Sequence, residues 1–133
     1  MAQNYAVDFF KEWSAGKGDY SFGKINDHHI FPKKVKEIDQ EKGKTFDDTK
    51  DFIVNRTLLL DETNIQIKNK RPSRYIQDMV KKHGTEDKVK SILEKHLISE
   101  QAYQFMKDDD YDQFIIEREK TIKKHLISVL GIR

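Results

Sequence analysis

Two adjacent histidines, His28 and His29, stand in the short stretch DHHIFPKK, whose apolar part ends at Pro32. The whole chain has only five histidines in 133 residues. An imidazole can bind a metal ion or transfer a proton near neutral pH, because its unperturbed pKa is about 6.5. Neighbouring residues on a strand point to opposite faces, so we expect different roles for the two: one as a metal ligand, the other in proton transfer.

Two asparagines could complete such a site. Asn64 offers a neutral amide oxygen, which would leave a divalent cation most of its charge for a phosphate group. Each of these residues also has an ordinary explanation when taken alone. The two histidines could pack in the core or form hydrogen bonds at the surface. Asn55 could be a turn residue, and Asn64 a polar residue in the first turn of a helix. The order of all four, with Asn55 and Asn64 nine residues apart across a predicted strand-to-helix junction, favours a site for a polyanionic substrate.

Three predicted elements would position these residues. FGKINDHHIF is typical of an extended segment, and VNRTLLL of a buried strand with a β-branched start. The two are expected to pair as a hairpin with a long connection. Asp61 is expected to cap a helix that begins at ETNIQIKN. The order is ββα, with polar residues where the three elements converge.

Helices are predicted for the rest of the chain. An N-terminal helix is expected in YAVDFFKEW, and a long C-terminal one, started by the acidic run 108–110, has apolar residues at helical spacing until Gly131. Between them, helices are expected in RPSRYIQDMVKKHG, ending at Gly84, in TEDKVKSILEKHL, capped by Thr85, and in SEQAYQFM, capped by Ser99. The predicted fold class is α+β and mainly α-helical, with a small ββα-metal finger embedded in one helical domain.

The stretches INDHHIFPKK, IVNRTLLLDETN and IKNKRPSRYI resemble the HNH, or His-Me finger, endonucleases. The likeness is greatest to the C-terminal domains of GmrSD-type restriction and anti-phage proteins, in which a ParB-like nucleotidase domain comes first. It runs from about Tyr20 to the end, because the tail KHLISEQAYQF with YDQFIIEREKTIKKHLISVLG also resembles theirs. Residues 1–19 are then an N-terminal helix and loop, and 20–133 the nuclease domain.

The resemblance implies a role for each site residue. His28 takes the first metal-ligand position, which is Asp in many relatives, and Asn64 takes the second. His29 is the general base that activates water, and Asn55 braces the loop that orients this base. The implied reaction is metal-dependent hydrolysis of DNA phosphodiester bonds with Mg²⁺ or Mn²⁺, leaving 5′ phosphate and 3′ hydroxyl ends.

Basic residues beside these motifs are expected to contact backbone phosphates, and the alternative for the basic run is an ordinary solvated face. They are Lys33, Lys34, Lys68, Lys70, Arg71 and Arg74. Arg74 could instead brace the core. Glu62 and Asp27 could support the metal or a histidine, but a solvated acid is the simpler interpretation of each. The remaining histidines, His83, His96 and His125, are expected to be structural or solvent-facing.

The composition narrows the other possibilities. The absence of cysteine excludes disulfides and cysteine-ligated zinc. No apolar run approaches the roughly 20 residues that span a bilayer, and the first residues do not resemble a signal peptide, so a cytoplasmic location with no membrane partner is expected. No phosphate-binding loop motif is present, so a nucleotidase partner would lie upstream or on another chain.

An alternative function is a nucleic-acid-binding module of the same fold that cleaves little without a partner domain or a second copy. The sequence leaves open whether the chain forms a homodimer, which DNA modification or sequence is recognised, and whether RNA is cut.

Overall fold

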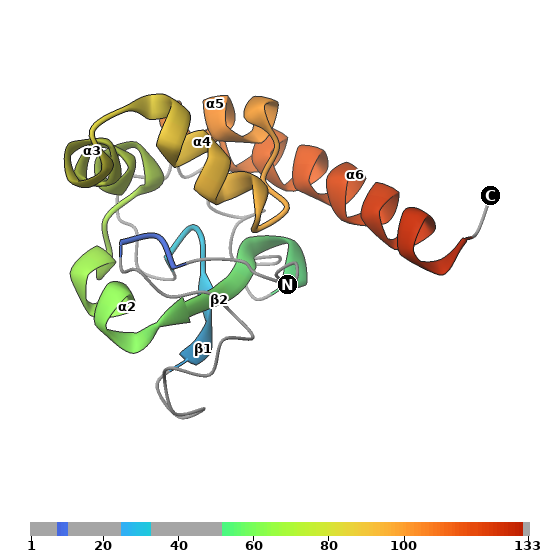
Figure 1. Cartoon of the computed structure of the whole chain (residues 1–133), viewed down its shortest axis with the longest axis horizontal. Coiled ribbons are helices and arrows are strands. Elements are labelled where there is room, and N and C mark those ends of the chain that lie inside the picture. The colour runs from blue at the N-terminus through green and yellow to red at the C-terminus, as the bar shows by residue number, and fades with distance from the viewer. Residues whose placement is uncertain (1–7, 11–24, 33–51, 132–133) are drawn as a thin grey trace.

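The computed structural model describes residues 8–10, 25–32 and 52–131. The described elements, arranged as in Figure 1, are β1 (Ile25–His29), a 3-10 turn η2 (Ile53–Asn55), β2 (Arg56–Leu60), α2 (Asp61–Ile67), α3 (Pro72–His83), α4 (Glu86–Glu94), α5 (Glu100–Lys107) and α6 (Tyr111–Leu130). Helices dominate this part of the chain, and β1 and β2 form one small sheet. The predicted class, α+β and mainly α-helical, is therefore confirmed.

The predicted hairpin is confirmed as an antiparallel pair of β1 and β2. Its register sets His28 opposite Thr57 and His29 opposite Arg56. The long connection between the two strands, residues 33–51, lies outside the described residues. α2 follows β2 without a loop, so the ββα order predicted from the sequence is present.

The prediction of an N-terminal helix is wrong where it can be compared, because Asp8, Phe9 and Phe10 form a bend. The buried carboxylate of Asp8 accepts a hydrogen bond from the backbone N–H of Phe10 at 3.0 Å, a local bond that competes with helix formation. The rest of YAVDFFKEW lies outside the described residues.

Asp8 also holds the start of α2. It accepts hydrogen bonds from the backbone N–H of Leu60, at 2.9 Å, and from the hydroxyl of Thr63. Asp61 is therefore not the cap that the sequence predicted. It is the first residue of α2, and the cap position falls on Leu60, whose side chain cannot accept a hydrogen bond.

The later helix ends mostly follow the sequence. Gly84 ends α3 at φ 95°, and Thr85 and Ser99 accept hydrogen bonds from backbone N–H groups of α4 and α5. The three residues of the acidic run 108–110 have different positions. Asp108 is the C-cap of α5, and Asp110 is the N-cap of α6. Asp109, at φ 54°, instead binds the backbone N–H and hydroxyl of Ser73 in the first turn of α3, at 2.9 and 2.6 Å.

The core lies between the ββα finger and helices α3 to α6, which gather on one side of it (Figure 1). Its largest fully buried apolar side chains are Tyr75, Tyr103, Tyr111, Phe9, Phe31, Phe114, Ile30, Leu59, Leu60, Met79 and Leu93. Phe31, just after β1, packs edge-on against Tyr111 of α6 with ring centroids 5.1 Å apart. The last helix is thus part of the scaffold behind the histidine strand.

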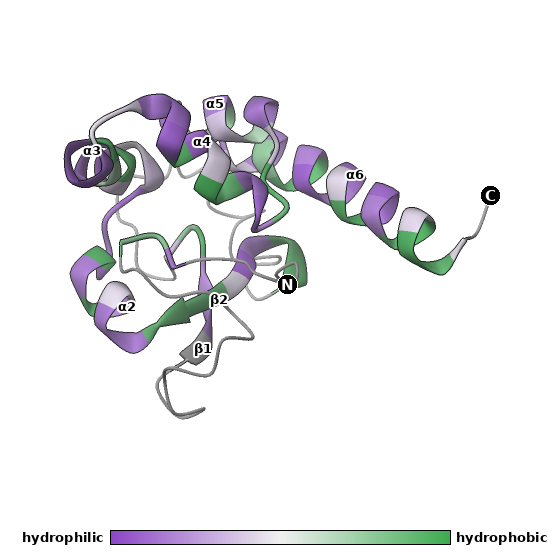
Figure 2. Cartoon of the chain, in the orientation of Figure 1, coloured by the Kyte–Doolittle hydropathy of each residue, from purple (hydrophilic) through white to green (hydrophobic). Residues whose placement is uncertain are grey.

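The far half of α6 extends away from this core (Figure 1). Tyr111, Phe114 and Ile122 of its predicted apolar stripe are buried, whereas Leu126 and Val129 are 39% and 65% exposed. In Figure 2 hydrophobic residues continue along this protruding part of the helix.

Candidate functional site

His28, His29 and Asn64 line one pocket, where the end of β1 meets α2. The hollow has a volume of about 440 Å³. Its other lining residues are Asp27, Pro32, Arg56, Lys68 and Asn69. The residues that the sequence selected for metal binding and proton transfer therefore come together, although β1 and α2 are far apart in the chain.

The two histidines occupy different settings, as strand alternation predicts. His28 stands opposite the buried Thr57, and His29 stands opposite the half-exposed Arg56. His29 is also the last residue of β1, so both imidazoles can reach the hollow at the end of the strand. Different chemical roles for the two are consistent with these settings.

The side chain of His28 is 15% exposed, and its Nε2 atom lies 3.3 Å from the Oδ1 atom of Asp61. Burial lowers the pKa of His28 below its usual value, because it disfavours the imidazolium, and Asp61 partly opposes this shift. A lowered pKa keeps the imidazole neutral at neutral pH. A neutral imidazole is the form that binds a metal ion.

Asn55 fixes the chain directly after the histidines. It is fully buried, and its side-chain oxygen accepts the backbone N–H of Phe31 at 2.8 Å while its amide nitrogen donates to the carbonyl of Phe31 at 3.1 Å. Its own carbonyl accepts the N–H of Ile30 at 2.7 Å. These bonds join η2 to the loop after His29.

Arg118 of α6 holds the segment around Asn55 from behind. Its side chain is fully buried, and its Nη1 atom donates to the carbonyls of Ile53, Val54 and Arg56 at 3.1, 2.9 and 2.7 Å. Its Nη2 atom donates to the carbonyl of His96 at 2.9 Å. Burial lowers the pKa of Arg118 to about 10, which still leaves the guanidinium charged at neutral pH.

The sequence interpretation missed Arg118, although a signal was present. The residue lies four positions after Phe114 and four before Ile122, inside the apolar stripe of the last helix. A charged residue within such a stripe requires buried partners. Arg56 was missed as well: it directly follows Asn55, lines the pocket, and places its Nε atom 3.2 Å from the Oδ2 atom of Asp27.

The other three histidines do not line the pocket. The Nδ1 atom of His96 lies 2.7 Å from the hydroxyl of Thr57, on the inner side of the hairpin. The Nε2 atom of His83 lies 2.7 Å from the carbonyl of Phe9. His125 is half-buried on α6. Among the described residues, no three His, Asp or Glu side chains gather closely enough to enclose a metal ion.

The donors that face the pocket nevertheless suit an open cation site. One imidazole and one amide oxygen would leave several coordination positions for water and phosphate oxygens, as Mg²⁺ sites that act on phosphates commonly do. Of these two donors, the amide oxygen is of the kind that Mg²⁺ and Mn²⁺ prefer.

The expected phosphate-binding residues are dispersed. Lys68 lines the pocket from the end of α2, at φ 50°, a backbone conformation that costs energy for a non-glycine residue. Lys70 pairs with Asp78 at 3.0 Å, Arg71 lies 3.4 Å from Asp109, and Arg74 is exposed on α3. Lys33 and Lys34 lie outside the described residues.

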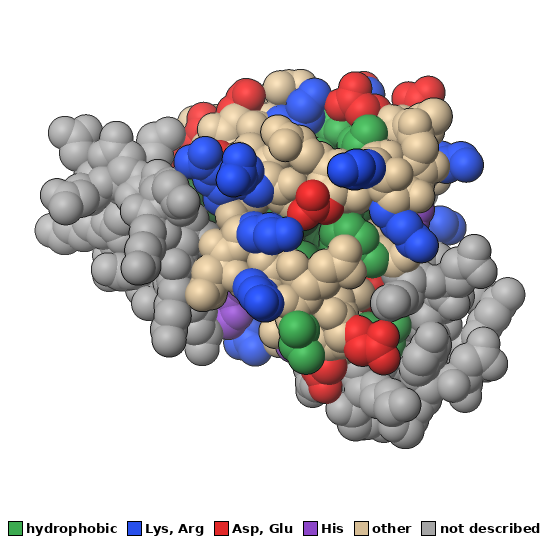
Figure 3. Space-filling model, turned by 90° about the vertical axis from the view of Figure 1, so that its left-hand side faces the viewer, with side chains coloured by type: hydrophobic (Ala, Val, Ile, Leu, Met, Phe, Trp, Pro, Cys, Tyr) green, Lys and Arg blue, Asp and Glu red, His purple; other side chains and the backbone are tan. Residues whose placement is uncertain are grey.

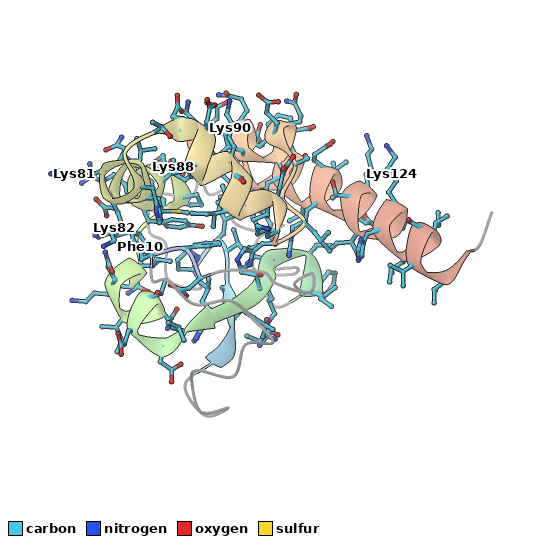
Figure 4. All side chains as sticks on the ribbon, in the orientation of Figure 1. Phe10, Lys81, Lys82, Lys88, Lys90 and Lys124 are labelled. Atoms are coloured by element: carbon cyan, nitrogen blue, oxygen red, sulfur yellow. The ribbon has the colours of Figure 1, made fainter. Side chains whose placement is uncertain are left out.

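Cations are spread widely over the described surface. Figure 3 shows several Lys and Arg side chains on one face, with acidic side chains among them. Figure 4 places Lys81 and Lys82 at α3, and Lys124 well away from them on α6. Of the four predicted contacts that lie in the described part of the chain, Lys68 is thus the one that lines the pocket. No described helix is long and apolar enough to cross a membrane.

No family model matches the chain, and no solved structure matches it. Among curated proteins, it is similar to an uncharacterized protein of Methanocaldococcus jannaschii, MJ0686, with 31% identity over 148 aligned positions. The alignment takes in 97% of this chain and 24% of that protein. The chain therefore spans about a quarter of the length of this relative.

Proposed function

We propose that the chain is an HNH endonuclease domain that hydrolyses DNA phosphodiester bonds with a divalent metal ion. The observation that supports this most is the convergence of His28, His29 and Asn64 on one pocket, within a ββα unit whose Asn55 clamps the loop after the histidines. Each of these residues has an ordinary explanation when taken alone. Their shared location is what favours a catalytic site.

In this proposal His29 accepts a proton from the attacking water, and Asn55 keeps the end of β1 in place while it does so. His28 and Asn64 would hold the cation, and Arg56 and Lys68 attract the phosphate to the pocket. Mg²⁺ or Mn²⁺, when bound, would supply charge for the phosphate and the departing 3′ oxygen. The products would carry 5′ phosphate and 3′ hydroxyl ends.

The biological setting we propose is a restriction or anti-phage protein of the cytoplasm. The chain spans only 24% of its archaeal relative, which agrees with a domain that works within a longer protein. A ParB-like nucleotidase part, on the same or another chain, would then control cleavage, and a homodimer would let two sites cut both strands.

The test is incubation of supercoiled plasmid with the purified chain in Mg²⁺, in Mn²⁺ or in chelator, followed by gel electrophoresis. His29→Ala is the test variant. His125→Ala is the matched control, because it removes an imidazole from α6 outside the pocket. Binding of each protein to a labelled duplex in chelator is measured in parallel.

The proposal predicts metal-dependent nicking that His29→Ala abolishes and His125→Ala retains, with duplex binding unchanged. Equal nicking by His29→Ala would refute the role of His29. Binding by all three proteins without any cleavage would favour the alternative, a nucleic-acid-binding module that depends on a partner.

A further inference from the structure

A second hollow lies between α2 and α3, and most of the charged side chains that line it are lysines. Lys70, Lys81 and Lys82 line it together with Gln66 and Asp78, and its volume is about 370 Å³. Lys70 forms an ion pair with Asp78 at 3.0 Å, so this carboxylate is already neutralised. With three lysines and one carboxylate, the hollow carries a net positive charge.

Lys81 and Lys82 are the two cations of this hollow that remain for a ligand. Both are exposed in the last turn of α3, where the helix dipole favours positive charge. Within the described part of the chain, no acidic side chain forms an ion pair with either of them. Figure 4 places both at α3, on the left of the view, and Figure 3 looks at the molecule from that side.

The hollow and the candidate catalytic pocket lie on opposite flanks of the end of α2. Asn64 lines the pocket and Gln66 lines the hollow, and two residues along an α-helix turn by about 200° around its axis. In the turn after the helix, Lys68 lines the pocket and Lys70 lines the hollow. The end of α2 therefore presents one lysine to each side.

A single strand of a duplex can reach both sides. An α-helix with its side chains is about 10 Å wide. The phosphates of one DNA strand follow each other at about 3.4 Å along the duplex axis, so about three nucleotides cross that width. Lys68, which stands at this crossing, has φ 50° and ψ −123°, a backbone conformation that is strained for a residue other than glycine. Such strain is often found at ligand-binding sites.

We propose that the end of α2 and the last turn of α3 form a phosphate track for double-stranded DNA, made of Lys68, Lys70, Lys81 and Lys82. The strand that enters the pocket continues along this track, and its backbone phosphates contact the lysines. This inference rests on the proposed function for the identity of the pocket. It adds the face on which the duplex lies, and two lysines of α3 that the sequence did not select.

The first experiment measures binding of a labelled DNA duplex by fluorescence anisotropy, in chelator, between about 50 and 200 mM salt. The double variant Lys81→Ala/Lys82→Ala is compared with Lys123→Ala/Lys124→Ala, a matched control that removes two adjacent exposed lysines from α6. Each lost phosphate contact should reduce the steepness of log affinity against log salt by about 0.9.

We expect this steepness to fall by about 1.8 in the Lys81→Ala/Lys82→Ala variant and by less than about 0.3 in the control. Equal falls in the two variants would overturn the inference. So would an unchanged steepness in Lys81→Ala/Lys82→Ala, or an unaltered chain that does not bind the duplex.

The second experiment tests whether the track leads to the pocket. The chain has no cysteine, so Asn69→Cys, Lys82→Cys and Lys124→Cys each provide one attachment point for a photo-crosslinker. Asn69 lines the pocket, Lys82 lines the hollow, and Lys124 is exposed on α6. We expect crosslinks to the duplex from positions 69 and 82, and none above background from position 124. Crosslinks from position 82 without crosslinks from position 69 would separate the hollow from the pocket and refute the track.

These outcomes do not depend on cleavage. A less steep salt dependence in Lys81→Ala/Lys82→Ala, with crosslinks from both positions, supports the inference even if plasmid is never cut. Cleavage that depends on His29, together with an unchanged salt dependence in that variant, supports the proposed function and refutes the inference. Thermal unfolding of each variant confirms that a folded protein is being measured.

Discussion

Asn55 joins the strand segment before β2 to the loop that follows the histidines, and Asn55→Ala tests how much this brace contributes. The substitution removes both side-chain hydrogen bonds to the backbone of Phe31, at 2.8 and 3.1 Å. Because Phe31 and Asn55 are both fully buried, water cannot replace these bonds. Leaving a buried polar group unsatisfied costs about 1–3 kcal/mol, so the expected loss of unfolding free energy is about 2–6 kcal/mol.

The assay is thermal unfolding followed by circular dichroism. With an unfolding entropy of about 2.1 cal/mol/K per residue, 133 residues give about 0.28 kcal/mol/K, and a loss of 2 kcal/mol lowers Tm by about 7 °C. Asn69→Ala is the control, because Asn69 is exposed at the edge of the same pocket, and its Tm should stay within about 2 °C. A shift of similar size in both variants would refute the bracing role of Asn55.

Three further perturbations probe the scaffold. Arg118→Met should reduce the unfolding free energy by about 3–5 kcal/mol in urea, because four carbonyls lose a buried charged donor; a loss below about 1 kcal/mol would contradict this. Asp8→Asn should lower the unfolding free energy by about 1–3 kcal/mol in the same assay, because an amide nitrogen would replace one of the two oxygens that accept hydrogen bonds. An unchanged unfolding free energy would refute the role of Asp8 in holding the start of α2. The hydrogen bond from Lys107, followed by that from Tyr103, lowers the pKa of Glu86 below its usual value of 4.5. The ionised carboxylate therefore stabilises the fold above pH 4.5. This stabilisation is lost as the pH falls through the lowered pKa. Glu86→Gln should therefore show a smaller fall in Tm than the unaltered chain on acidification from about pH 5 to 3.

The features predicted best from the sequence are those that depend on interactions between residues close together in the chain. Thr85, Ser99 and Gly84 act on helix ends within a few residues of themselves, so their roles could be assigned from local pattern. The hairpin and the helix after it were likewise evident from strand-like and helical composition. The convergence of His28, His29 and Asn64 followed from that order of elements.

Hydrogen bonds between residues far apart in the chain could not be predicted in this way. Asp8 holds the start of α2 from 52 residues away, and its hydrogen bond with Phe10 accompanies a bend at residues 8–10, where local periodicity favoured a helix. The cap position of α2 falls on Leu60, and Asp61, the first residue of the helix, lies 3.3 Å from His28. Arg118 similarly joins parts of the chain more than 60 residues apart. The bracing geometry of Asn55 was expected only through the family resemblance.

The central claim is that His29 acts as the base in metal-dependent cleavage of DNA, and the most direct test is the nicking rate of the unaltered chain and His29→Ala at saturating enzyme with Mg²⁺. Saturation makes the ratio of rates independent of affinity. The account predicts that His29→Ala is slower by about 10²- to 10⁴-fold while it still binds the duplex, as expected for loss of a positioned general base. Rates within about twofold of each other, or nicking that persists in chelator, would contradict it.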